Sequence, residues 1–218
     1  MTLSFAILGS GTGAILVSYL SKRRLAFFIL KPLTTLLIFT LVLASVPGSD
    51  RVYPVLIAAG LGFSLAGDIF LMLPTQHFLY GIMSFSVTHI LYLVAFIVRD
   101  SVFLVHPLTL LFGVIAAALT LLIWRGIKPS LRIPVLLYVT LITGMAAQAT
   151  GAAIALKTAG VTIAALGAMF FFLSDAILAV DRFRSPFEAA RAAVLSSYWI
   201  GQWLIAMSTR PGYAAVYG

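Results

Sequence analysis

The sequence contains no cysteine and has few charged residues. Only 9% of its 218 residues are charged, and the acidic ones number six against 14 lysines and arginines. The absence of cysteine excludes disulfide bonds, thiol nucleophiles and thiolate metal sites, and it carries no information about the cellular compartment. The scarcity of charge argues against a soluble domain, in which about a quarter of the residues are charged.

Apolar residues make up most of the chain. They account for 62% of the sequence, and the mean hydropathy is +1.12. Apolar runs of about 20 residues are long enough to cross a bilayer as helices, and these runs do not alternate as barrel strands do. We therefore predict an all-α membrane protein, a bundle of about eight transmembrane helices. The runs are 3–20, 26–46, 52–73, 78–98, 103–124, 131–150, 158–180 and 188–208.

Short connections join these runs, so neighbouring helices are expected to be antiparallel. No linker separates two parts of the chain, which predicts a single integral membrane domain over residues 1–218. The first run lacks a basic start and an A-x-A-like cleavage site, and we interpret it as a retained helix rather than a signal peptide.

The net charge of +8 is distributed as in a membrane protein, which argues against nucleic-acid binding. Nine basic residues follow odd-numbered runs and four lie in the other connections. This asymmetry predicts cytoplasmic odd-numbered connections and both termini outside, and the short loops suggest a bacterial inner membrane. The nine are Lys22, Arg23, Arg24, Arg125, Lys128, Arg132, Arg182, Arg184 and Arg191; the four are Arg51, Arg99, Lys157 and Arg210.

Two aspartates, Asp68 and Asp175, interrupt apolar runs. Each lies six residues before the inner boundary of its predicted helix, roughly 9 Å below the interface. Their shared depth suggests two parallel four-helix repeats, although the halves otherwise look little alike, and such a repeat would bring the carboxylates together. Intramembrane carboxylates cost about 2.5–3.5 kcal/mol each, so both are candidates for function. The alternative is a structural hydrogen bond, with Ser64 as the nearby partner of Asp68.

Other polar residues lie within the predicted helices, Lys31 and Tyr138 in the same inner half and His89 close to mid-membrane. Lys31 has three interpretations: it reaches back to the cytoplasm, pairs with an aspartate, or binds a lipid phosphate. Tyr138 either donates a hydrogen bond to a carboxylate or fills space as an amphipathic side chain. His89 and Tyr92 are three residues apart and share a helix face, with His89 serving as a helix contact or a ligand. Gln202 is expected to join helices by hydrogen bonds.

An ordered set of motifs spans essentially the whole chain. It comprises K-P (31–32), S-L-x-G-D-x-x-L-M-L (64–73), F-x-x-G (78–81), H-x-x-Y (89–92) and S-D-x-x-L-A (174–179), the last beginning at Ser174. This set resembles the YhhN-like, lysoplasmalogenase family. The resemblance implies a membrane-embedded hydrolase that cleaves the vinyl ether bond of lysoplasmalogens into a fatty aldehyde and a glycerophospho-alcohol.

The chemistry of a vinyl ether suits the two aspartates. Protonation of its β-carbon needs an acid, and the resulting oxocarbenium ion needs a base or an anion nearby, as in glycosidases. Burial and mutual repulsion would keep one aspartate protonated while the other stays ionised; the sequence does not say which. Lys31, with Arg182 as the weaker candidate, would hold the lipid phosphate.

The expected partners are the lysophospholipid substrate and membrane lipids, and no cofactor is expected. No three histidines can meet within the membrane, so a zinc site is not predicted, although the carboxylates together with His89 stay open as a ligand set. Two other functions stay open: a transporter in which the aspartates relay protons or bind a cation, and a lipid-binding scaffold without chemistry. The sequence does not indicate the oligomeric state.

Overall fold

Every regular element of the described residues in the computed structural model is a helix. The structure describes residues 2–19, 24–46, 51–74, 77–101, 103 and 106–214. The predicted all-α fold is confirmed. The α-helices are α1 (Thr2–Ser18), α2 (Arg24–Leu43), α3 (Val52–Met72), α4 (Phe78–Asp100), α5 (Leu110–Ile123), α6 (Arg132–Leu156), α7 (Ala159–Phe183), α8 (Ala190–Met207) and the short α9 (Pro211–Ala214). Three 3-10 turns flank α5 and precede α6: η3 (Pro107–Thr109), η4 (Trp124–Gly126) and η5 (Pro129–Leu131).

Six helical segments of the described residues are long and apolar enough to cross a membrane. They correspond to six of the predicted runs, and the chain is an integral multi-pass membrane protein. The remaining two long helices are α1, a shorter apolar helix, and α8, which carries polar residues such as Gln202. That α1 and α8 also span stays a prediction. The six segments are Leu25–Leu43, Val52–Met72, Phe78–Asp100, Pro107–Gly126, Pro129–Leu156 and Ala159–Phe183.

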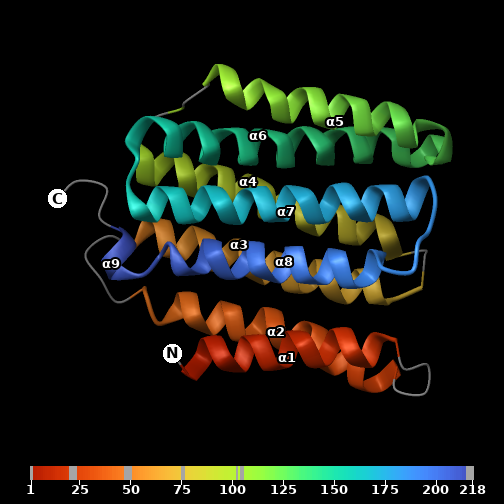
Figure 1. The fold of residues 1–218 in the computed structure, drawn as a ribbon, viewed down its shortest axis with the longest axis horizontal. Coiled ribbons are helices and arrows are strands. Elements are labelled where there is room, and N and C mark those ends of the chain that lie inside the picture. The colour runs from red at the N-terminus through yellow and green to blue at the C-terminus, as the bar shows by residue number, and fades with distance from the viewer. Residues whose placement is uncertain are drawn as a thin grey trace.

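The long helices lie side by side along one axis, and consecutive helices run in opposite directions (Figure 1). Their contacts place α2, α3, α4, α6, α7 and α8 in a closed ring. Outside this ring, α1 packs on α2 and α8, while α5 packs on α6 and α7. The peripheral helices α1 and α5 are the first helices of the two halves, but an internal repeat stays a prediction.

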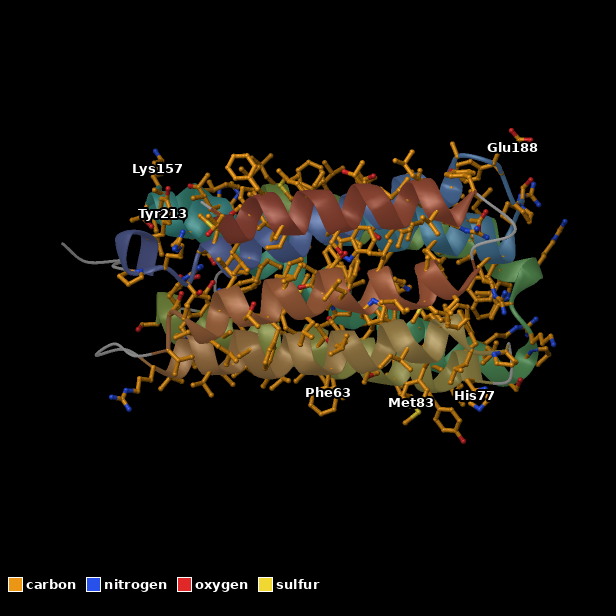
Figure 2. The ribbon with its side chains drawn as sticks, turned by 90° about the horizontal axis from the view of Figure 1, so that it is seen from below. Phe63, His77, Met83, Lys157, Glu188 and Tyr213 are labelled. Atoms are coloured by element: carbon orange, nitrogen blue, oxygen red, sulfur yellow. The ribbon has the colours of Figure 1, made fainter. Side chains whose placement is uncertain are left out.

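The two ends of the bundle differ in charge. We call the end that holds the connections after α1, α3, α5 and α7 the basic end, because Arg125, Lys128, Arg184 and Arg191 gather there. Figure 2 shows His77 and Glu188 at this end and Lys157 and Tyr213 at the opposite end. Lys22 and Arg23, which contributed to the predicted asymmetry, lie outside the described residues.

The outer surface of the bundle is apolar, as contact with lipid requires. Phe63 on α3 and Met83 on α4 project away from the bundle (Figure 2) and are 45% and 56% exposed. Inside, α7 and α8 approach backbone to backbone at Gly167 and Gly201. A Cβ atom on Gly201 would lie 2.8 Å from the Gly167 carbonyl oxygen, so only glycine permits this contact.

The charge count assumed that Arg99 lies in a connection, but the structure places it in a helix. It belongs to the last turn of α4, is buried, and forms a bidentate ion pair with Asp100: Nε lies 2.6 Å from Oδ1 and Nη2 lies 3.1 Å from Oδ2. Nη1 also donates to the Tyr53 hydroxyl at 2.9 Å, and that hydroxyl shares a hydrogen bond with Ser208. The predicted orientation, which counted Arg99 among the connections, stays a prediction.

The orientation of the bundle can be tested by cysteine labelling, because the chain has no native cysteine. Ser130 near the basic end and Lys157 at the opposite end are both exposed. The positive-inside rule predicts that Lys157→Cys reacts with an impermeant maleimide in intact cells and that Ser130→Cys reacts only after permeabilisation. The reverse pattern would place the basic end outside.

Candidate active site

Asp68 and Asp175 line the same cavity, which has a volume of about 110 Å³. The cavity lies in the half of the bundle near the basic end, and α2 to α8 all contribute to its wall. Most of the wall is apolar, so the few polar groups in it are conspicuous. The polar and charged lining residues are Lys31, Asp68, Thr120, Tyr138, Ser174, Asp175, Arg182 and Tyr198.

The Asp68 carboxylate is surrounded by hydrogen-bond donors. Lys31 Nζ lies 3.0 Å from its Oδ1 atom. The hydroxyls of Thr35 and Tyr198 donate to its Oδ2 atom at 2.7 and 2.9 Å. Lys31 and Thr35 are four residues apart on α2, so both reach α3 from one helix face. A cation and two hydroxyl donors thus compensate this buried carboxylate.

This arrangement decides between the interpretations of Lys31. Its side chain is 10% exposed and paired with Asp68, so it does not reach back to the aqueous phase. The sequence had left these alternatives open, and the ion pair is the one observed.

Asp175 has fewer partners. The Tyr138 hydroxyl of α6 donates to its Oδ2 atom at 2.6 Å, as one interpretation of Tyr138 predicted. The side chain is 12% exposed, against 2% for Asp68, and both residues line the cavity. The Oδ1 atom of Asp175 accepts no hydrogen bond from the described residues. Asp175 is therefore the carboxyl group with an oxygen open to a bound molecule.

His89 lies behind Asp175 and is fully buried. Its Nε2 atom is 3.4 Å from Asp175 Oδ2, but neither ring nitrogen makes a hydrogen bond of good geometry to a described residue. The ring instead packs edge-on against Tyr138 and Phe171, at centroid distances of 5.1 and 4.9 Å. A small displacement of either side chain would turn the His89–Asp175 approach into a hydrogen bond.

Three predicted site residues form a separate network deeper in the bundle. The Tyr92 hydroxyl donates to Gln202 Oε1 at 2.6 Å, and Gln202 Nε2 donates to Ser64 Oγ at 2.8 Å. Ser64 in turn donates to Thr88 at 3.2 Å. None of the three lines the cavity, and Ser64 does not bond to Asp68 as the structural alternative supposed. The network joins α3, α4 and α8, which is the role predicted for Gln202.

Ser174 and Arg182 both line the cavity, with different surroundings. The Ser174 hydroxyl donates to the Val194 carbonyl oxygen of α8 at 3.0 Å, so it joins two helices. Arg182 is exposed near the end of α7, and its guanidinium lies over the Phe78 ring, 4.8 Å from the centroid. Within the described ranges, no three His, Asp or Glu side chains gather into a possible metal-binding group.

Thr35 and Tyr198, which both donate to Asp68, were not assigned to the site from the sequence. The spacing of four residues between Lys31 and Thr35 was visible in the sequence. It could have suggested that the two share a partner, since residues four apart on a helix lie on one face.

Comparison with known proteins places the chain in a family. Residues 26–209 match the YhhN family. Lysoplasmalogenase TMEM86A of Homo sapiens is 34% identical over 173 residues, which cover 74% of this chain and 66% of the human protein. The uncharacterized membrane protein YhhN of Escherichia coli O157:H7 is 30% identical over 181 residues, covering 83% and 86%. No solved structure matches the chain.

A more distant relative extends the comparison. The lysoplasmalogenase homolog of Dictyostelium discoideum is 26% identical over 200 residues, covering 75% of this chain and 65% of that protein. The chain thus spans about two thirds of the length of the human and Dictyostelium relatives. The family match covers all of the cavity-lining residues described above. This chain belongs to the YhhN family.

Proposed function

We propose that the protein is a lysoplasmalogenase that hydrolyses the vinyl ether bond of single-chain alkenyl glycerophospholipids. The observation that carries this proposal is the pair of aspartates with unequal surroundings in one apolar cavity. The names of the human and Dictyostelium relatives support it. None of the relatives reported above is named as a transporter.

The reaction needs one proton and one water molecule. An acid protonates the β-carbon of the vinyl ether, and the electrons of the double bond form the new C–H bond. The resulting oxocarbenium ion adds water and loses a proton to a base, which gives a hemiacetal. The hemiacetal then loses its hydroxyl proton, and the C–O bond to the glycerol oxygen breaks as that oxygen gains a proton. The products are a fatty aldehyde and a glycerophospho-alcohol. Glycosidases handle a similar cation with two carboxyl groups.

The surroundings of the two aspartates support different roles in this sequence. Asp68, with a cation and two hydroxyl donors, suits the anion that stabilises the oxocarbenium ion. Asp175 lines the cavity and has an oxygen that accepts no hydrogen bond from the described residues, so it suits the acid that delivers the proton. The same carboxylate can afterwards accept the proton of the attacking water.

Lys31→Met tests the role given to Asp68. The variant leaves the buried Asp68 carboxylate without the cation 3.0 Å away that compensates it and fixes its position beside the cavity. We expect kcat to fall by about a hundredfold, within the range that such groups contribute, with little change in KM. Lys31→Arg, which keeps the charge, should retain more activity. A rise in KM alone would instead make Lys31 a ligand of the substrate.

The proposed function is tested by incubating the purified protein with a lysoplasmalogen and measuring aldehyde release. The matched control is the corresponding saturated ether lipid, which has no double bond to protonate and should release no aldehyde. The proposal fails if the monodisperse protein releases no aldehyde from either lipid.

A further inference from the structure

One cation in the cavity wall has no compensating charge. Lys31 and Arg182 are the basic side chains among the described lining residues, and Lys31 is paired with Asp68. Within the described ranges, no carboxylate lies at ion-pair distance from Arg182. Its guanidinium is stacked on Phe78, which leaves the N–H groups at its edge able to bind an anion.

The neighbouring acid does not occupy this guanidinium. Asp181 precedes Arg182 directly, but its Oδ1 atom accepts a hydrogen bond from the backbone nitrogen of Phe187 at 3.2 Å. The Asp181 carboxylate is therefore hydrogen-bonded to the backbone of the connection between α7 and α8. Arg182 is left as the positive group at the end of the cavity near the basic end.

Arg182 lies on the same face of α7 as Asp175. The two residues are seven positions apart, which is nearly two helical turns, and Leu178 and Ala179 lie between them on that face. All four side chains line the cavity. At about 1.5 Å per residue, Arg182 is about 10 Å closer to the basic end than Asp175. Along this face of α7, a carboxyl group is followed by two apolar side chains and then by a guanidinium.

We propose that Arg182 binds the phosphate of the substrate and thereby places the vinyl ether at Asp175. In an alkenyl lysophospholipid, about seven bonds separate the phosphorus from the β-carbon. An extended chain covers about 1.2 Å per bond, so they span about 8 Å. The lipid segment is thus slightly shorter than the distance of about 10 Å between Asp175 and Arg182 along α7, and the length of the arginine side chain can make up the difference. The lipid chain then continues past Asp175 toward Phe172 and Ile142, away from the basic end.

This proposal rests on the proposed function for the identity of the lipid, and it predicts a preference that the function alone does not. A lipid with a phosphate should bind more tightly than the same lipid without one. The preference should disappear in Arg182→Gln. The matched control is Arg184→Gln, because Arg184 is an exposed arginine two residues later that does not line the cavity.

Binding of two non-hydrolysable ligands tests the preference without requiring turnover. They are a saturated alkyl lysophosphoethanolamine and the corresponding alkylglycerol, measured by native mass spectrometry of the purified proteins. We expect Arg182→Gln to weaken binding of the phospholipid about tenfold or more, the effect of losing a charged hydrogen bond, and to leave alkylglycerol binding unchanged. Arg184→Gln should bind both ligands as the unaltered protein does.

Two results would overturn the assignment. Equal weakening of both ligands by Arg182→Gln would mean that the residue shapes the cavity without binding phosphate. Inorganic phosphate that competes with the phospholipid as strongly as a second lysophospholipid does would assign the guanidinium to free phosphate. Aldehyde release is measured separately, so a protein that prefers the phospholipid but releases no aldehyde would contradict the proposed function alone.

Discussion

Replacing Asp175 with asparagine is expected to abolish turnover while the protein remains folded. The amide keeps the size of the side chain and can still accept the hydrogen bond from Tyr138, but it has no proton to give. Removal of an acid of this kind costs about 10²–10⁴-fold in rate. The measurement is kcat for aldehyde release from a lysoplasmalogen at matched purity and monodispersity.

Asp68→Asn should reduce kcat to a similar degree for a different reason. It removes the negative charge between Lys31, Thr35 and Tyr198, and with it the anion proposed to stabilise the cation. Because the two groups act in one step, the double variant should be little worse than the poorer single variant. Asp181→Asn is the control, since Asp181 is an acid of α7 that does not line the cavity. Activity near normal in either aspartate variant would remove that residue from catalysis.

Asp100→Asn is expected to cause the largest loss of stability. Its carboxylate is fully buried and holds the guanidinium of Arg99 through both oxygens. Breaking a buried ion pair from one side costs about 3–5 kcal/mol, because the remaining charge is left without compensation. The measurement is the midpoint of thermal unfolding in detergent.

The double variant Arg99→Met with Asp100→Asn provides the control for this loss. It removes both charges together, so it should unfold at a higher temperature than Asp100→Asn alone. An unfolding midpoint for Asp100→Asn equal to that of the unaltered protein would show that the ion pair contributes nothing to stability.

The helices could be predicted from the sequence because the length of an apolar run is itself the constraint that a bilayer imposes. Asp68 and Asp175 could also be selected from the sequence, because a carboxylate within the membrane is costly and is seldom kept without a function. The fold brings both residues to one cavity. What could not be predicted was which helix faces meet. Ser64 lies one turn from Asp68 along the chain, yet it bonds to Gln202 and Thr88, while Thr35 and Tyr198 reach Asp68 from other helices.

Arg99 shows the limit of counting charges. An arginine at the end of an apolar run can extend into water or turn inward to a partner, and the sequence pattern is the same for both. Here Asp100 and Tyr53 turn it inward. The neighbouring Asp100 does not show from the sequence that Arg99 turns inward. The other partner, Tyr53, belongs to a different helix, and the sequence does not show which helices meet.

The most direct test of the account is the fate of the proton that the acid delivers. If Asp175 protonates the vinyl ether, the transferred hydrogen ends on C2 of the released aldehyde. The reaction is run in heavy water, the aldehyde is trapped at once by reduction, and the product is analysed by mass spectrometry. We predict one deuterium at C2 and a slower rate than in ordinary water, because carbon protonation limits vinyl ether cleavage. An aldehyde without deuterium at C2 would contradict protonation at carbon and the role proposed for Asp175.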